Sequence, residues 1–147
     1  MLGMTLNLES QAKLTKMLIQ DEGYNQFLYK DTRNILTCGY GFNMESDGLY
    51  PEECDFILHN RLVKREKQLI KDLPYYNNLN DNVKSVLLNL AYCMGEHGLI
   101  GFHNMLAYIQ ASDWANASRE LLDSQFGKDH ANRAQRLAYL LEQEIPK

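Results

Sequence analysis

Apolar residues recur at helical spacing over most of the chain and at strand spacing only near its start. In Glu9–Glu22 they return every three or four positions, as in an amphipathic helix that Asn7 can cap. Gly23 suits the position just after a helix end. The runs Phe27–Tyr29 and Ile35–Cys38 are rich in strand formers and are separated by turn-forming residues, so they predict a β-hairpin.

Helical periodicity dominates the rest of the chain. Pro51 fits the first turn of a long helix that Pro74 ends. Asn80 or Asp81 can cap the next helix, and Gly95 is expected to end it. The pattern predicts helices at about 51–73, 81–94, 102–111, 113–123 and 130–143. A small hairpin followed by a helical region is an α+β arrangement.

The chain length fits one compact domain made of two small lobes. It has 147 residues, with no internal repeat and no linker rich in Pro, Gly or Ser. We expect a single domain over 1–147, in which about 23–50 forms the hairpin lobe. Residues 51–73 form a connecting helix, and 1–22 together with 74–147 form the helical lobe.

The net charge indicates which kinds of binding partner are not expected. The formal net charge of −4 argues against a nucleic-acid binder, which is expected to carry a basic patch or stripe. Arg133 and Arg136 form one local positive cluster.

No stretch approaches the roughly 20 apolar residues that span a bilayer. Met1–Leu8 lacks the basic and apolar regions of a secretory signal, so we expect synthesis and initial residence in the cytosol.

Cysteine and histidine spacing predicts no metal site and no cofactor. The three cysteines are far apart in sequence and lack ligand spacing, so reduced thiols are expected, with one disulfide as the alternative: Cys38, Cys54 and Cys93. The four histidines fall on different predicted elements: His59, His97, His103 and His130.

Two acids flank the predicted hairpin. A hairpin that folds back would bring Glu22, Asp31 and Thr37 close to the end of the first helix. Cleavage of a glycosidic bond needs a protonated acid for the leaving oxygen and an ionised carboxylate to activate water or stabilise a cationic sugar. Glu22, beside apolar Phe27 and Leu28, should hold its proton more tightly, whereas Asp31 in a wet turn should stay ionised. The alternative interpretation is that Glu22 and Asp31 are ordinary acidic side chains on the solvated surface, with no part in catalysis.

Three motifs in the same order resemble those of the phage-type lysozyme family. The first is a Glu-x8-Asp-x5-Thr signature at Glu22, Asp31 and Thr37. The second is a Met-Gly-Glu-x-Gly-x-x-Gly-Phe region at 94–102. The third lies in the last helices, at Trp114, Ser124 and 132–136. The resemblance covers residues from about 14 to 139.

The resemblance implies a lysozyme-like fold and a muramidase, an enzyme that hydrolyses the β-1,4 bond between N-acetylmuramic acid and N-acetylglucosamine in peptidoglycan. Glu22 would be the general acid, and Asp31 with Thr37 would position or activate the attacking water. The family usually inverts the anomeric centre. Arg133 matches an arginine that contacts the catalytic Glu, and Tyr92 matches an aromatic residue at the sugar cleft.

The resemblance also implies a biological setting. The protein would be a phage or prophage endolysin, a monomer without stable membrane insertion. It would wait in the host cytoplasm until a membrane pore lets it reach the periplasmic cell wall. The alternatives are an inactive peptidoglycan-binding module, a wall-degrading toxin or virion lysin, and a lytic transglycosylase, whose chemistry needs only one acid.

The chain departs from the family pattern away from the three catalytic candidates. Asn34 stands in the hairpin turn, where the family usually has Gly, and can adopt the same backbone. Phe42 replaces a His, and Glu120 stands where an Asn lies at the cleft. The segment after Asn43 is short, which predicts a smaller hairpin lobe. These departures bear on substrate affinity and subsite preference.

Overall fold

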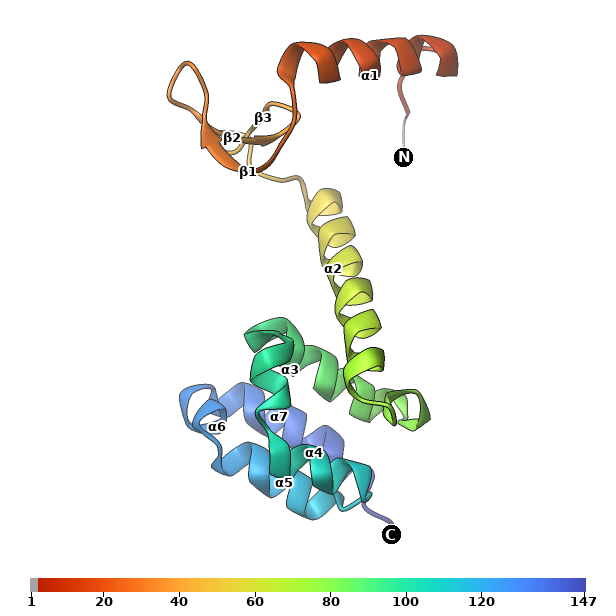
Figure 1. Cartoon of the computed structure of the whole chain (residues 1–147), viewed down its shortest axis with the longest axis vertical. Coiled ribbons are helices and arrows are strands. Elements are labelled where there is room, and N and C mark those ends of the chain that lie inside the picture. Colours follow the sequence, from red (N-terminus) through yellow and green to blue (C-terminus); the bar gives the residue numbers. More distant parts are fainter. Residues whose placement is uncertain (1–2) are drawn as a thin grey trace. The chain divides into compact units, whose positions relative to one another are not determined.

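The computed structural model describes residues 3–147, so Met1 and Leu2 of the Met1–Leu8 segment lie outside the described residues. The chain forms two compact units, which we call the N-terminal unit (Met1–Phe56) and the C-terminal unit (Ile57–Lys147). Helix α2 (Pro51–Asp72) begins in the first unit and continues into the second. Figure 1 labels the elements.

The first helix of the N-terminal unit is the one that the sequence predicts. Helix α1 spans Leu8–Glu22. The Asn7 side chain caps it by accepting the backbone N–H of Ser10 at 2.8 Å, which satisfies one donor of the first turn. Gly23 leaves the helix with φ 71, and its N–H donates to the carbonyl of Ile19. Both predicted boundaries are confirmed.

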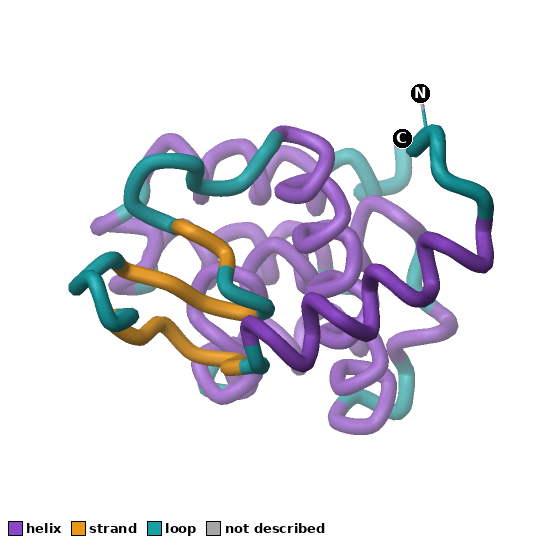
Figure 2. Tube along the Cα trace, turned by 90° about the horizontal axis from the view of Figure 1, so that it is seen from above, coloured by secondary structure: helices purple, strands orange, loops and turns teal. Residues whose placement is uncertain are grey.

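A small antiparallel sheet follows, with its strands drawn in orange in Figure 2. Its strands are β1 (Asn25–Lys30), β2 (Leu36–Gly39) and β3 (Phe42–Asn43), with β2 in the centre. The predicted hairpin is confirmed, and Asn34 in its turn adopts φ 63. The third strand is a finding of the structure, because two residues are too short to show a periodicity in sequence.

Strand β1 is irregular. Asn25 pairs with Gly39 and Tyr29 pairs with Thr37, so four steps along β1 correspond to two steps along β2. Extra residues of this kind bend a strand and increase its local twist. The bulge therefore makes β1 longer in sequence than the strand it pairs with.

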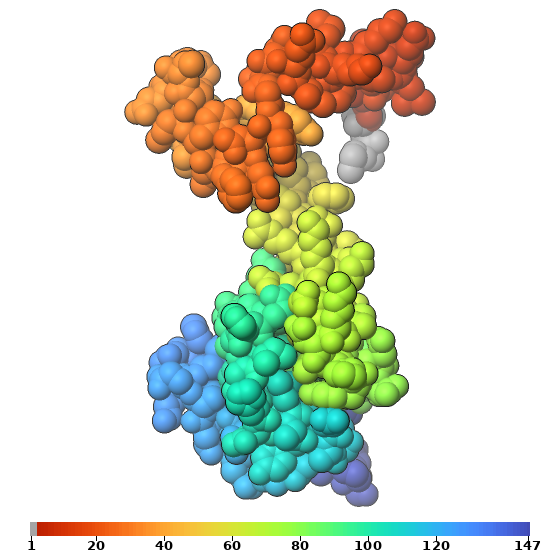
Figure 3. Space-filling view, in the orientation of Figure 1, coloured from red at the N-terminus to blue at the C-terminus, as the bar shows by residue number. Residues whose placement is uncertain are grey.

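The C-terminal unit is helical and contains the hydrophobic core. After α2 its helices are η1 (Tyr76–Asn78), α3 (Asp81–Ile100), α4 (His103–Gln110), α5 (Trp114–Asp123), α6 (Gln125–Asp129) and α7 (Ala131–Glu142). Helix α5 packs against α4 and α7, and α3 also packs against α7. The core is one cluster of buried residues between Leu69 and Leu141. On the face drawn in Figure 3, the atoms of α4 and α5 lie side by side.

The helical unit differs from the sequence prediction in two respects, the end of α3 and an additional short helix. Gly95 has φ 75 and ψ 167 and interrupts the helix as expected, but the helical chain resumes and α3 ends only at Ile100. The short helix α6 has no counterpart in the prediction. Ser124 caps α6 by accepting the N–H of Gly127, a local hydrogen bond that hydrophobic spacing does not reveal.

The predicted α+β class is confirmed by this small sheet and the helical unit. The joining of 1–22 with 74–147 in one helical lobe stays a prediction. Within residues 3–147, no helix is both long and apolar enough to cross a bilayer.

Candidate active site

Glu22 is the last residue of α1, and its side chain rests on a glycine of the turn between β2 and β3. Gly41 has φ 73, a conformation that favours glycine. A Cβ atom built on Gly41 would lie 2.9 Å from the carboxyl carbon of Glu22, closer than real Cβ contacts. The Glu22 carboxyl group therefore lies directly against backbone that only a glycine leaves open. No motif in the sequence connects this glycine with Glu22.

Water reaches the surroundings of Glu22. The Glu22 side chain is exposed, and Phe27 and Leu28 are 70% and 59% exposed. These two residues thus supply little of the shielding that the sequence predicted for Glu22.

Asp31 follows β1, and its carboxylate closes the hairpin loop. One oxygen, Oδ1, accepts the backbone N–H of Arg33 at 2.8 Å and that of Ile35 at 2.9 Å. The N–H of Ile35 is the main cause that lowers the pKa of Asp31, and the N–H and guanidinium of Arg33 and the ammonium of Lys30 add to it. The direction agrees with the expectation that Asp31 stays ionised. The second oxygen, Oδ2, is 3.9 Å from Arg33 Nε.

Thr37 lies in the middle of the sheet. It is 4% exposed and pairs with Tyr29 of β1 on one side and Asn43 of β3 on the other. Its hydroxyl donates to the carbonyl of Ile35 at 2.8 Å, and the oxygen keeps acceptor capacity for a water molecule.

The three candidates are arranged along β2. The carboxylate of Asp31 is bound to Ile35 just before the strand, and Glu22 lies against the turn that follows Gly39. Ile35 and Gly39 are four residues apart, which is about 13 Å of extended chain, and Thr37 is midway. The sheet thus brings a helix-end acid, an ionised acid and a buried hydroxyl into one region. Such a set can donate a proton at one end and activate water at the other.

Glu45 is a charged residue at this site that sequence analysis missed. Its Oε1 accepts from Lys30 Nζ at 2.7 Å and from the N–H of Leu36 at 2.8 Å. The hydrogen bond from Lys30, followed by that from Leu36, lowers the pKa of Glu45, while the charge of Asp31 acts in the opposite direction. Glu45 ties the loop after β3 to both strands of the hairpin. No motif marks it in the sequence.

Tyr92, the predicted sugar contact, lies on α3 in the C-terminal unit and is 40% exposed. The guanidinium carbon of Arg65 is 6.0 Å from the centre of its ring, within range of a cation–π contact. Nη1 of Arg65 is also 3.0 Å from both carboxylate oxygens of Glu96. The Tyr92 ring is therefore partly accessible and has a fixed cation beside it.

Arg133, on α7, is half-buried and bonded within its own unit. Its Nε donates to the side-chain oxygen of Asn89 at 2.8 Å. This contact fixes the guanidinium against α3. The predicted contact between Arg133 and Glu22 stays a prediction.

Metal ligands and disulfides do not enter this site. Within the described residues, no three His, Cys, Asp or Glu side chains converge so that they could hold a metal ion. The three cysteines are free, with Cys38 half-buried and Cys54 and Cys93 exposed.

Comparison with known proteins gives one family and two similar proteins. The sequence model of a family described as phage lysozyme matches residues 19–139, a range that contains all five candidate residues. A probable T4-type lysozyme 1 of Dictyostelium discoideum is 23% identical over 160 residues, covering 89% of this chain and 94% of that protein. A probable T4-type lysozyme 2 of the same organism is 24% identical over 165 residues, with the same coverage of both chains.

Proposed function

The chain belongs to the phage lysozyme family, and from this premise we propose that it is a muramidase. Its substrate is bacterial peptidoglycan, in which it hydrolyses the β-1,4 bond between N-acetylmuramic acid and N-acetylglucosamine. Glu22 is the general acid, and Asp31, with Thr37, positions or activates the attacking water. The observation that supports this most is the position of Glu22 and Asp31 at the two ends of β2, with Thr37 between them.

The chemistry follows from the protonation states. Glu22 gives its proton to the glycosidic oxygen as the bond from that oxygen to the anomeric carbon breaks. Water forms the new bond to the anomeric carbon and loses a proton to Asp31, which is ionised because backbone N–H groups stabilise its charge. Because water, and not a carboxylate, forms the new bond to the anomeric carbon, the product has the inverted configuration.

Two residues of the C-terminal unit complete the proposed machinery. The exposed part of the Tyr92 ring stacks on a pyranose ring of the glycan. Arg133, on α7, is the second substrate-binding residue.

The test is Glu22→Gln in a turbidity assay on permeabilised Gram-negative cells. Loss of the general acid should reduce the rate of clearing at least 100-fold with an unchanged circular dichroism spectrum. Asp21→Asn is the matched control, because Asp21 is the neighbouring exposed acid of the same helix and has no part in the mechanism. It should clear cells at the wild-type rate.

Other outcomes contradict the proposal in distinct ways. If the wild type leaves cells intact, or Glu22→Gln clears them equally fast, an inactive binding module or another acid is supported. If Asp31→Ala stays fully active and mass spectrometry finds anhydro-sugar ends, the reaction is a lytic transglycosylation. Analysis of the new anomeric centre by NMR checks inversion.

For its biological setting we propose a phage or prophage endolysin that acts as a monomer, supported by the family to which the chain belongs. The protein waits in the host cytoplasm and reaches the periplasmic wall through a membrane pore made by another protein. Expression in a Gram-negative host should cause lysis only when a pore-forming protein is co-expressed. Lysis without the pore would contradict this route and favour a wall-degrading toxin or virion lysin.

A further inference from the structure

The loop after β3 carries a carboxylate that binds two neighbouring strands at once. One oxygen of Glu45, Oε1, accepts hydrogen bonds from Lys30 Nζ at 2.7 Å and from the backbone N–H of Leu36 at 2.8 Å. Lys30 is the last residue of β1 and Leu36 is the first residue of β2, and the two residues are paired in the sheet. Glu45 therefore clamps the residue pair that closes the hairpin loop.

This residue pair borders both of the groups that we propose to handle the attacking water. Asp31 directly follows Lys30, and Thr37 directly follows Leu36. The carboxylate of Asp31 accepts the N–H of Ile35, the residue just before Leu36. A shift of Lys30 against Leu36 would therefore change the distance between the Asp31 carboxylate and the Thr37 hydroxyl.

The loop that presents Glu45 is itself fixed to the strand that contains Thr37. Asn43 pairs with Thr37, and its side-chain oxygen accepts the backbone N–H of Glu45 at 3.1 Å, as in an Asx turn. Between these residues, the N–H of Met44 donates to the carbonyl of Leu36 at 2.9 Å. The Glu45 carboxylate thus projects from a backbone that already has a fixed register on β2.

The exposure of the clamp indicates a role in geometry and not in stability. The side chains of Lys30 and Glu45 are 53% and 44% exposed, and exposed ion pairs contribute little to the free energy of unfolding. A catalytic rate is more sensitive, because a displacement of about 1 Å can reduce it 100-fold. Loss of the clamp should therefore affect turnover more than folding.

We propose that Glu45 is a positioning residue of the hydrolysis, which holds Asp31 and Thr37 at the spacing that one water molecule needs. It acts through Lys30 and Leu36 and takes no proton itself. The proposal rests on the proposed function, because it takes Asp31 and Thr37 as the groups that position or activate water. The contact with Leu36 matters more, since it holds the strand backbone, whereas the contact with Lys30 holds a flexible side chain.

Three variants separate the two contacts. Glu45→Ala removes both, whereas Glu45→Gln keeps an acceptor oxygen for the Leu36 N–H and loses only the ion pair. Lys30→Met also loses only the ion pair. At neutral pH, with soluble glycan strands as the substrate, kcat should fall about tenfold or more in Glu45→Ala and less than about threefold in the other two. KM should stay within about twofold of the wild type in all three, because no substrate contact is removed.

A double variant checks that Lys30 and Glu45 act as one pair. Lys30→Met combined with Glu45→Gln removes the same ion pair that either single variant removes. Its kcat should therefore equal that of the single variants, and the two effects should not multiply. Multiplied effects would show that Lys30 and Glu45 act separately and would contradict the clamp.

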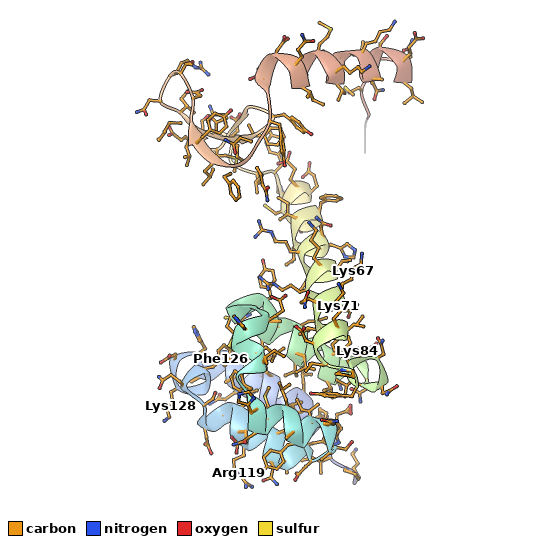
Figure 4. The ribbon with its side chains drawn as sticks, viewed as in Figure 1. Lys67, Lys71, Lys84, Arg119, Phe126 and Lys128 are labelled. Carbon is orange, nitrogen blue, oxygen red and sulfur yellow. The ribbon has the colours of Figure 1, made fainter. Side chains whose placement is uncertain are left out.

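The ion pair between Glu9 and Lys13 provides the matched control in the same unit. Lys13 Nζ lies 3.2 Å from Glu9 Oε1, and both side chains are exposed. Figure 4 shows the side chains at the start of α1 lying away from those of the sheet. Glu9→Ala removes an exposed ion pair of the same kind and should leave kcat unchanged. The melting temperatures of Glu9→Ala and Glu45→Ala should both lie within about 4 °C of the wild type.

Several results would overturn the proposal. A wild-type kcat in Glu45→Ala would show that turnover does not need the clamp, and a raised KM with unchanged kcat would place Glu45 in substrate binding. Equal losses of kcat in Glu45→Gln and Glu45→Ala would show that the charge acts and not the contact with Leu36. If Glu45→Ala does not fold, Glu45→Asp replaces it. Its carboxylate is one methylene shorter and should lower kcat about threefold or more, and an unchanged kcat would equally contradict the proposal.

Failure of the clamp is distinguishable from failure of the proposed function. If the wild type cleaves glycan and Glu22→Gln does not, but Glu45→Ala keeps the wild-type kcat, only the positioning role is wrong. Hydrogen exchange tests the clamp without any activity, because Glu45→Ala should lower the protection of the Leu36 and Ile35 amides and Glu45→Gln should preserve it. An inactive wild type that shows this exchange pattern contradicts the muramidase and keeps Glu45 as the residue that sets the hairpin geometry.

Discussion

Different interactions stabilise the two units of the molecule, each within itself. The C-terminal unit has a continuous cluster of buried apolar residues that reaches from Leu69 to Leu141. In the described part of the N-terminal unit, Thr37 is the buried side chain, and the buried apolar residues all lie beyond Phe56. The sheet there is held by strand pairing, by the carboxylates of Asp31 and Glu45 on backbone N–H groups, and by glycine turns.

This difference shows which forces position the proposed catalytic groups. Hydrophobic packing stabilises a helical platform but does not place Glu22 or Asp31. Their side chains are oriented by hydrogen bonds and by close backbone approach, interactions in which small changes of geometry matter more than buried area. Stability and catalysis should therefore respond to substitutions in different units.

The largest expected effect is on stability, in the C-terminal unit. Leu90 on α3 is fully buried in the core, and Leu90→Ala removes apolar contacts and leaves a cavity. The free energy of unfolding should fall by roughly 2–5 kcal/mol. Denaturant titration followed by circular dichroism measures it. The matched change in the N-terminal unit is Phe27→Ala, at a side chain that is 70% exposed. It should lower the free energy of unfolding by less than about 1 kcal/mol. Equal losses would contradict the comparison.

The next effect is on catalysis, in the N-terminal unit. Gly41→Ala would push a methyl group against the Glu22 carboxyl group, whose flexible side chain must then move. Because a displacement of about 1 Å can reduce a rate 100-fold, we expect kcat to fall tenfold or more.

Gly48→Ala is the control for backbone strain. Gly48 also has positive φ, 61 against 73 for Gly41, but a Cβ there meets no atom within 4 Å. Both variants should lose about 1 kcal/mol of stability, since both force an alanine into the left-handed region. Only Gly41→Ala should lower kcat and shift the pH profile of activity. A parallel loss of activity in both would show that strain, and not the position of Glu22, is responsible.

The smallest effect concerns the pH dependence of the hairpin. The hydrogen bond from the Ile35 N–H lowers the pKa of Asp31 in the folded protein. The ionised carboxylate therefore stabilises the folded hairpin fully above the ordinary aspartate pKa of about 3.9, and this stabilisation is lost as the pH falls through the lower pKa of the folded state. Carboxyl NMR should give a titration midpoint of Asp31 below 3.9, and the protection factor of the Ile35 amide against hydrogen exchange should fall on acidification. Asp31→Asn keeps an acceptor oxygen but no titrating group, and should abolish this pH dependence. A midpoint at or above 3.9 would contradict the assignment.

Much of the local structure can be predicted from the sequence, because its causes are local. The Asn7 cap, the Gly23 exit, the left-handed Asn34 and the helix break at Gly95 each follow from the conformational preferences of one residue or a few. The spacing of Glu22, Asp31 and Thr37 and their resemblance to a family signature likewise need only the linear chain. These local features are enough to predict the fold class and the family from the sequence.

The tertiary structure decided what depends on residues that are distant in sequence. The bulge in β1, the brief strand β3 and the position of Gly41 beneath Glu22 arise from pairing registers, which hydrophobic periodicity does not encode. The same holds for Glu45, whose carboxylate accepts from Lys30 and from the N–H of Leu36. Charged surface residues carry no periodic signal, so their partners are fixed only when the backbone has brought them together.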